Sequence, residues 1–190
     1  MMELIVTNEL TLRTPVPETD GPRLAALIAR DRETLAQWLP WVPKTTQASE
    51  IAFLRELVKQ ADQHQSLQLV MVWQGDPVGM MGFNRFYQRE AGRQTAEIGY
   101  WLANHAVRHG LMHQAVLALC QLGFATYQLE QISIIAAVLN QRSNHVAQRA
   151  GFHLDRVLPA RITLSNGQQV DANDWIKVNP DRQVHENPVY

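Results

Sequence analysis

The chain has 190 residues, of which 46% are hydrophobic and 18% charged, which is typical of a globular domain with its own core and excludes a disordered or fibrous protein. Its 17 basic and 18 acidic residues leave a formal charge of −1, without the basic excess of a DNA- or RNA-binding protein. The single cysteine, Cys120, excludes an internal disulfide and a four-thiolate metal site. We find no signal peptide and no apolar run long enough for a membrane helix, so we expect a cytoplasmic protein without DNA or membrane partners.

The front part of the chain combines a strand with helices. Residues 9–13 alternate polar and apolar side chains, which predicts the first strand. The spacing of apolar residues predicts helices over 20–29 and 32–39, and prolines interrupt the second of them. Ser49 is expected to cap a longer helix, because apolar residues follow it at helical spacing as far as Ala61.

Strands predominate in the rest of the chain. The predicted strands are 67–73, 78–86, 95–102, 131–139, 152–158 and 170–178, and the predicted helices are 110–126 and 140–150. The pair Asn166-Gly167 indicates a hairpin turn before the last strand, since both residues tolerate positive φ. This order of elements predicts an α/β (α+β) domain over residues 1–178, with helices on both faces of a mixed sheet, followed by a polar tail over 179–190.

The first stretch that carries chemistry is a strand, a short loop and a helix that opens at Gly110. The first turn of a helix leaves backbone N–H groups without partners, and the helix dipole favours negative charge there. Gly110 allows a phosphate to approach the backbone closely. The same unit is often only a connection between elements, so the residues alone leave an anion site and a simple connection both open.

A second stretch runs from a strand into a helix that begins near Asn140 and is closed by Gly151. Asn140 favours a helix cap, because its side-chain oxygen accepts bonds from the N–H groups of the first turn. A second interpretation puts Asn140 and Ser143 in a cleft, where both contact a ligand. Tyr100 and Phe83, from the preceding strands, are assigned to the core.

These two stretches, in this order and at about this spacing, resemble the GNAT acetyltransferases, and most closely their RimJ/RimL branch. The residues that carry the resemblance are Glu97-Ile98-Gly99-Tyr100-Trp101-Leu102, Gly110-Leu111-Met112, Ala115, Asn140, Ser143, Gly151-Phe152, Leu10-Thr11-Leu12-Arg13, Trp38-Leu39-Pro40-Trp41, Asn166-Gly167 and Asp171. The resemblance implies the GNAT fold, a mixed and mostly antiparallel central sheet with helices on both faces. This sheet would be splayed between the strand that ends at Leu102 and the strand that ends at Leu139.

The resemblance implies acetyl-CoA as the cosubstrate, an amine as the acceptor and no metal. The backbone of three residues would pair with the pantetheine arm of acetyl-CoA: Trp101, Leu102 and Ala103. The N–H groups of five residues would hold the pyrophosphate: Arg108, His109, Gly110, Leu111 and Met112. Asn140 would also bind the pantetheine arm. Homodimers are frequent among proteins of this kind.

For the chemical step the resemblance implies two catalytic residues. Glu97 would take the proton that the amine must lose, directly or through water, and its structural alternative is a glutamate bonded to neighbouring strands or loops. Ser143 would protonate the leaving thiolate. Trp38 and Trp41 would form an aromatic wall of the acceptor pocket, and their alternative role is to pack the helical segment over the sheet.

The expected phosphate loop departs from the family at its start. The family usually has Gln or Arg there, often followed by Gly-x-Gly, whereas this chain has Val107, Arg108 and His109 before Gly110. Arg108 and His109 either contact the phosphates themselves or mark a weakened cosubstrate site. The histidines of this region are spaced by four, but no carboxylate completes the set, so we expect no metal site.

Three functions are compatible with these observations. The first is acetylation of an α-amine, such as the N-terminus of a ribosomal protein. The second is acetylation of a small amine, such as an aminoacyl nucleotide or an antibiotic, which a closed aromatic pocket would favour over an open groove. The third is a non-catalytic GNAT-like module that binds a ligand or a partner, and acetyl-CoA binding separates this module from the two enzymes.

Overall fold

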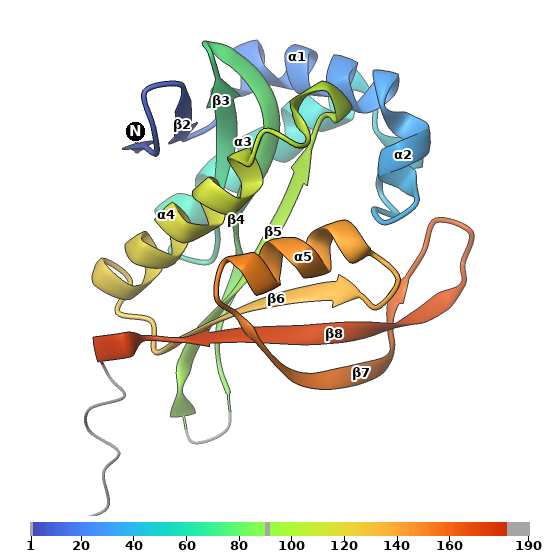
Figure 1. The fold of residues 1–190 in the computed structure, drawn as a ribbon. Coiled ribbons are helices and arrows are strands. Elements are labelled where there is room, and N and C mark those ends of the chain that lie inside the picture. The colour runs from blue at the N-terminus through green and yellow to red at the C-terminus, as the bar shows by residue number, and fades with distance from the viewer. Residues whose placement is uncertain (1, 90–91, 182–190) are drawn as a thin grey trace, which may run out of the picture.

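An eight-stranded sheet carries the fold in the computed structural model, which describes residues 2–89 and 92–181 (Figure 1). The strands lie side by side in the order β1-β2-β3-β4-β5-β6-β8-β7. They are β1 (Glu3–Ile5), β2 (Leu10–Arg13), β3 (Leu67–Trp73), β4 (Asp76–Gln88), β5 (Gln94–Leu102), β6 (Gln131–Ala137), β7 (His153–Thr163) and β8 (Gln169–Val178). The helices are α1 (Pro17–Arg30), α2 (Arg32–Ala36), α3 (Gln47–Asp62), α4 (Leu111–Ala125) and α5 (Gln141–Arg149), with short 3-10 helices η1 (Val42–Lys44) and η3 (Asn104–Ala106).

The sheet opens between β5 and β6, which form the parallel pair among otherwise antiparallel described strands. Their paired residues run only as far as Ile98 with Ile134. Beyond this point β5 continues to Leu102 beside β4, and β6 continues to Ala137 beside β8. In Figure 1, β5 accordingly rises steeply while β6 and β8 run across the molecule. The predicted splay of a mostly antiparallel sheet is confirmed.

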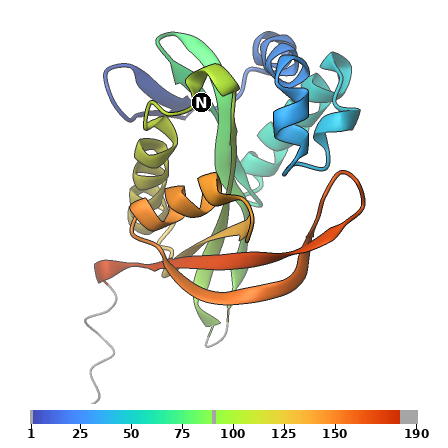
Figure 2. The same cartoon turned by 45° about the vertical axis from the view of Figure 1, so that its right-hand side comes forward.

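Apolar side chains fill both faces of the sheet. One core lies on the side of α4 and α5 and contains Ile98 and Leu119, and the other lies on the side of α1 and α3 and contains Leu24, Leu54 and Trp101. Ile98 and Trp101 both come from β5, so this strand alternates between the two cores as its sequence predicts. Figure 2 shows the two groups of helices on opposite sides of the central strands.

The start of α3 lies earlier than predicted. The side chain of Thr46 accepts the N–H of Ser49 at 3.2 Å, and the hydroxyl of Ser49 accepts the N–H of Thr46 at 2.9 Å. This reciprocal arrangement is a capping box, in which the first residue is the cap and the residue three positions later is already helical. The prediction that Ser49 caps the helix was therefore wrong, since Thr46 is the cap.

The end of β6 also differs from the prediction of a strand over 131–139. Val138 donates its N–H to the carbonyl of Asp171 at 3.0 Å, and Asn140 donates its N–H to the carbonyl of Ala137 at 2.9 Å. The chain therefore turns after Ala137 to begin α5. Leu139 is 72% exposed, so its apolar character does not reflect burial in the sheet.

Two further strands differ from the predictions. β1 was not predicted, because its three residues paired with β2 are too few to display an alternating pattern. β7 continues beyond the predicted end at residue 158 and reaches Thr163. Its register with β8 shifts between Leu158 and Ile162, and Pro159 lies in this irregular stretch of an edge strand, where a missing N–H is tolerated.

The packed part of the chain extends just beyond β8. Asn179 is buried, donates its N–H to the carbonyl of Glu130 at 2.9 Å and donates its side-chain amide to the carbonyl of Leu129 at 3.1 Å. Residue 179 thus belongs to the fold, while residues 182–190 of the predicted tail lie outside the described residues. Within the described residues, no helix has the length and apolar character needed to cross a membrane.

Candidate active site

The end of β5 presents backbone groups to the opening of the sheet. Ala103 donates its N–H to the carbonyl of Val78 in β4, at 2.8 Å. Alternate residues of an antiparallel strand bond to the same neighbour, so the N–H and C=O of Leu102 point away from β4 and toward the opening. Beyond Ile98 the pairing with β6 has ended, which leaves the backbone of Leu102 accessible to an extended ligand.

This geometry distinguishes among the residues expected to bind the pantetheine arm. The carbonyl of Ala103 accepts the N–H of Ala106 at 3.0 Å, so both backbone groups of Ala103 already have protein partners. By the same alternation the backbone of Trp101 faces β4, and its indole is buried in the core beside α1 and α3. Leu102 therefore has its backbone groups directed into the opening, whereas Trp101 and Ala103 do not.

The expected phosphate loop leads into α4 through two left-handed residues. Arg108 has φ 71° and Gly110 has φ 75°, and Gly110 is the N-cap of α4. No side chain caps this helix, so the N–H groups of Leu111 and Met112 at its first turn have no partner within it. The left-handed conformation costs a non-glycine residue about 1 kcal/mol, which explains why glycine is common where this chain has Arg108.

The two side chains of this loop lie differently. The His109 ring packs against the ring of Trp73, at the end of β3, with ring centroids 4.7 Å apart. Arg108 is exposed and makes no hydrogen bond or ion pair with any described residue. His109 thus anchors the loop to the sheet, and Arg108 remains available to an anion.

A buried carboxylate fixes the start of the same loop. Asp31, at the junction of α1 and α2, accepts the backbone N–H of Asn104 at 2.7 Å and is itself 6% exposed. Arg30 binds both oxygens of Asp31, at 2.9 and 3.0 Å, and this bond holds the pKa of Asp31 below its ordinary value. Asn104 also donates its side-chain amide to Thr34 at 3.1 Å. The residues that lead from β5 toward α4 are therefore tied to the α1–α2 junction.

The start of α5 lies on the other side of the opening. Asn140 caps this helix, since its Oδ1 accepts the N–H of Ser143 at 3.2 Å, as the sequence indicated. Asn144, which is buried, donates to the carbonyls of Ala137 and Asn140 at 3.0 and 2.9 Å. It also accepts the indole N–H of Trp175 in β8 at 2.8 Å. Asn144 thus holds the first turn of α5 to the ends of β6 and β8, a role that the sequence analysis missed.

Tyr100 joins the two sides of the opening. Its hydroxyl lies 2.8 Å from Oγ of Ser143. Its ring packs against the core beside α4 and α5, as predicted, and burial raises the pKa of its phenol to about 12. Assigning Tyr100 only to the core missed this contact, because alternation predicts the face of a side chain but not what its far end reaches.

Glu97 lies on the opposite face of β5 from Ile98 and Tyr100. Its Oε2 accepts a hydrogen bond from Nη2 of Arg85 in β4 at 2.8 Å, and its side chain is 16% exposed. Ser133, its register partner in β6, forms a hydrogen bond with the hydroxyl of Tyr87 at 3.1 Å. The carboxylate expected to act as the base therefore lies in a polar part of this sheet face, and its other oxygen makes no hydrogen bond with the described residues.

Comparison with known proteins identifies the family. The sequence profile described as "Acetyltransferase (GNAT) domain" matches residues 9–153. The chain belongs to the GNAT acetyltransferase family. A ribosomal-protein-serine acetyltransferase of Escherichia coli (strain K12) is 32% identical over 182 residues, which cover 94% of this chain and 98% of that protein.

Solved GNAT structures match the whole fold. RimL, described as a ribosomal L7/L12 alpha-N-protein acetyltransferase in complex with coenzyme A, superposes with a TM-score of 0.86 at 25% identity, covering 93% of this chain and 98% of that one. The microcin C7 self immunity acetyltransferase MccE, in complex with acetyl-CoA and AMP, gives a TM-score of 0.85 at 26% identity, covering 92% and 94%. This GNAT chain is an acetyl-CoA-dependent N-acetyltransferase, and its predicted fold, RimJ/RimL-like branch and cosubstrate are confirmed.

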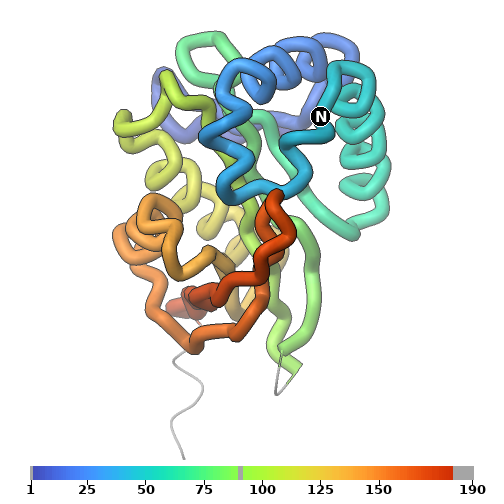
Figure 3. Tube along the Cα trace, turned by 90° about the vertical axis from the view of Figure 1, so that its right-hand side faces the viewer, coloured from blue at the N-terminus to red at the C-terminus, as the bar shows by residue number. Residues whose placement is uncertain are grey.

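The two tryptophans expected at the acceptor side of this GNAT enzyme follow α2. Trp38 is half-buried, Trp41 is 40% exposed, and neither ring stacks on another aromatic ring of the described residues. Figure 3 shows the turn that follows α2 beside the tip of the β7–β8 hairpin, and the other two views agree. Trp41 thus offers an exposed aromatic surface in the segment that follows α2.

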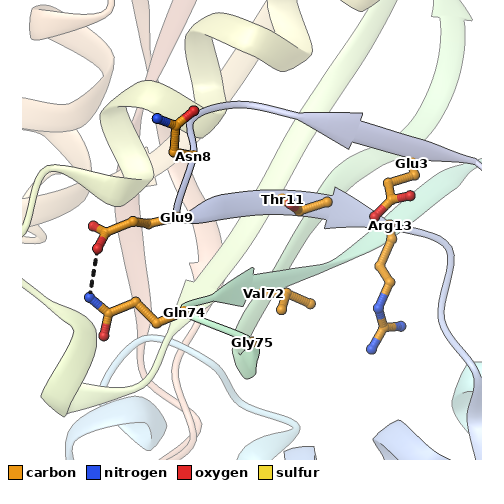
Figure 4. Close-up of a pocket in the computed structure, with 8 residues that line it drawn as sticks. All are labelled: Glu3, Asn8, Glu9, Thr11, Arg13, Val72, Gln74 and Gly75. Atoms are coloured by element: carbon orange, nitrogen blue, oxygen red, sulfur yellow. Dashed lines mark hydrogen bonds between the residues drawn. The ribbon is translucent and has the colours of Figure 1, made fainter.

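A separate hollow of about 390 Å³ lies at the opposite edge of the GNAT sheet, over β1, β2 and β3 (Figure 4). Its lining residues are Glu3, Asn8, Glu9, Thr11, Arg13, Val72, Gln74 and Gly75. Gln74 donates to Glu9 at 3.0 Å across one end of it. None of the residues expected to bind acetyl-CoA or the acceptor lines this hollow.

Proposed function

We propose that this chain transfers the acetyl group of acetyl-CoA to the α-amine of a protein N-terminus, and that a ribosomal protein carries this amine. The observation that carries the proposal is the match to the Escherichia coli ribosomal-protein-serine acetyltransferase, which spans 98% of that protein and so includes its acceptor side. We also propose that residues 1–178, with Asn179 packed against them, form one catalytic domain, and that it acts in the cytoplasm, where ribosomal proteins are made.

In this proposal acetyl-CoA lies in the opening between β5 and β6. The pantetheine arm pairs with the backbone of Leu102 as an added strand, which is supported by the direction of its N–H and C=O. The pyrophosphate accepts the N–H groups of Leu111 and Met112, and the exposed Arg108 adds a positive charge. Asn140 caps α5 with its oxygen and offers its amide nitrogen to the arm.

Glu97 and Ser143 divide the proton transfers of the proposed reaction. A neutral amine attacks the thioester carbon, and the proton that its nitrogen loses passes to Glu97. The carbon–sulfur bond breaks, its electron pair stays on sulfur, and Oγ of Ser143 gives its proton to that sulfur. Solvent takes the proton from Glu97 and returns one to Ser143, so the products are the acetylated amine and free CoA.

A second acceptor, a small aminoacyl nucleotide, is favoured by one specific observation. MccE, with a TM-score of 0.85 to this chain, is described in complex with AMP as well as acetyl-CoA. Trp41 is 40% exposed after α2, and an indole stacks readily on a nucleobase. Trp38 and Trp41 would then hold the base, whereas for a peptide they would contact its first side chains.

The proposal is tested with the purified full chain, acetyl-CoA and two sets of acceptors. One set contains peptides that match the N-termini of ribosomal proteins, and the other contains aminoacyl nucleotides; CoA release and acceptor mass are measured. We expect kcat/KM for the best peptide to exceed that for the nucleotides by about 100-fold. The reverse ratio would support the small-amine enzyme. Failure of acetyl-CoA to bind at millimolar concentration in calorimetry would contradict both enzymes and favour the binding module.

A further inference from the structure

Tyr100 and Ser143 form a contact that spans the opening of the sheet. The tyrosine hydroxyl lies 2.8 Å from Oγ of Ser143 and 3.4 Å from its carbonyl oxygen. Among the described residues, no other side-chain hydrogen bond joins β5 to α5. The N–H of Ser143 is held at the same time by Asn140, at 3.2 Å. Ser143 is therefore fixed through its backbone by the helix cap and through its side chain by Tyr100.

The direction of the hydroxyl protons decides what this contact does. Each hydroxyl has one proton to donate and lone pairs that accept. If Ser143 donates to Tyr100, its proton is occupied and cannot reach a sulfur in the opening. If Tyr100 donates to Ser143, the serine proton is free to point elsewhere. Only the second arrangement agrees with Ser143 as the acid.

The surroundings of Tyr100 favour this second arrangement. Its ring packs against the core beside α4 and α5, and the residue is half-buried. Burial raises the pKa of Tyr100 to about 12, so the phenol keeps its proton at neutral pH and stays a donor. The Ser143 carbonyl, at 3.4 Å, lies too far from the hydroxyl to compete strongly with Oγ for that proton.

We propose that Tyr100 is a positioning residue for acetyl transfer, which donates its hydroxyl proton to Oγ of Ser143 and thereby directs the serine proton to the leaving sulfur. When the carbon–sulfur bond breaks, the electron pair stays on sulfur and takes the proton of Ser143. The negative charge left on Oγ accepts the hydrogen bond of Tyr100 until solvent returns a proton to Ser143. This inference rests on the role of Ser143 in the proposed function.

Tyr100→Phe removes one oxygen and keeps the packed ring. We expect kcat to fall about tenfold, the effect of losing one hydrogen bond to a developing charge, with the KM for acetyl-CoA and the melting temperature unchanged. Tyr127→Phe is the matched control, because Tyr127 packs against the same core and its hydroxyl makes no hydrogen bond with the described residues. It should leave kcat at the wild-type value.

A double-mutant cycle with Ser143→Ala separates a role through Ser143 from a purely structural one. Ser143→Ala alone should lower kcat about 100-fold, and adding Tyr100→Phe should then lower it no further. A full tenfold loss in the Ser143→Ala background would overturn the proposal, because Tyr100 would act independently of Ser143. Normal kcat for Ser143→Ala would remove the acid role of Ser143, while a wild-type enzyme that acetylates no amine would refute the proposed function itself.

Discussion

At the scale of single residues, each proposed catalytic side chain has a partner on a neighbouring element. Arg85 of β4 binds Glu97 at 2.8 Å, and Tyr100 of β5 reaches Ser143 at 2.8 Å. Alternation along β5 predicted that Glu97 and Ile98 face opposite sides, which the two cores confirm for Ile98 and Trp101. Alternation along one strand could not predict Arg85 or Ser143 as partners, because each of them lies on another element. Tyr100 and Ser143, for example, are 43 residues apart in the chain.

Glu97→Gln tests the proposed base. The amide keeps the size of the side chain but cannot take a proton, so kcat/KM at neutral pH should fall about 100-fold and the acid limb of the pH–rate profile should disappear. Glu56→Gln, an exposed change on α3, is the matched control and should leave both unchanged. An unaltered pH profile for Glu97→Gln would assign Glu97 to the structural role that its bond with Arg85 also permits.

At the scale of elements, the start of α5 combines a helix cap with a proposed ligand contact, and two substitutions of Asn140 separate them. Asn140→Ser keeps a capping oxygen but loses the amide nitrogen, whereas Asn140→Ala loses both. We expect Asn140→Ala to lower the free energy of unfolding by about 1 kcal/mol and Asn140→Ser by a few tenths. Both should raise the Kd for acetyl-CoA about tenfold in calorimetry. Wild-type affinity in Asn140→Ser would show that Asn140 only caps the helix.

The junction of α1 and α2 is a second element whose role is visible only in three dimensions. Asp31 binds the N–H of Asn104, 73 residues away, so no local pattern could reveal the tie between this junction and the loop before α4. The start of a helix depends on residues close together in the chain, and is easier to predict. The cap of α3 was nevertheless assigned to Ser49 instead of Thr46, because serine and threonine are both common at helix caps. The strand over 67–73, by contrast, was predicted with the bounds that β3 has.

Asp31→Asn tests this tie. The variant loses the charged bond to Arg30, which is half-exposed, so the free energy of unfolding at neutral pH should fall by about 1–2 kcal/mol. The pKa of Asp31 is lowered from 3.8, so its stabilisation is present above that value and is lost as pH falls through the folded pKa. In urea unfolding at successively lower pH, the difference in the free energy of unfolding between the wild-type protein and Asp31→Asn should therefore shrink. Asp62→Asn, an exposed change at the end of α3, should show no difference at any pH.

At the scale of the whole molecule, the opening divides the sheet into β1–β5 and β6–β8, which pair with each other only as far as Ile98 and Ile134. The order of strands and helices from β2 onward could be predicted from local patterns, since each of these strands alternates or is apolar over most of its length, whereas β1 is too short to show a pattern. The opening between β5 and β6 could not be predicted from local patterns, because the residues of β5 beyond Ile98 are as typical of a paired strand as those before Ile98. Only the resemblance to a known family implied the opening. A ligand that pairs with Leu102 would add contacts between the two parts.

Acetyl-CoA should therefore stabilise the molecule as a whole and protect the edges of the opening in particular. At about 100 times its Kd it should raise the free energy of unfolding by about 2.7 kcal/mol, or the melting temperature by about 5–10 °C. In hydrogen exchange, the amide of Leu102 should exchange more slowly with acetyl-CoA than without it, because it gains a bond to the pantetheine arm. The amide of Val70, inside β3 and paired with Arg13 of β2 and Met80 of β4, is the internal control and should change little. Stabilisation without protection of Leu102 would place the cosubstrate elsewhere on the chain and contradict binding between β5 and β6.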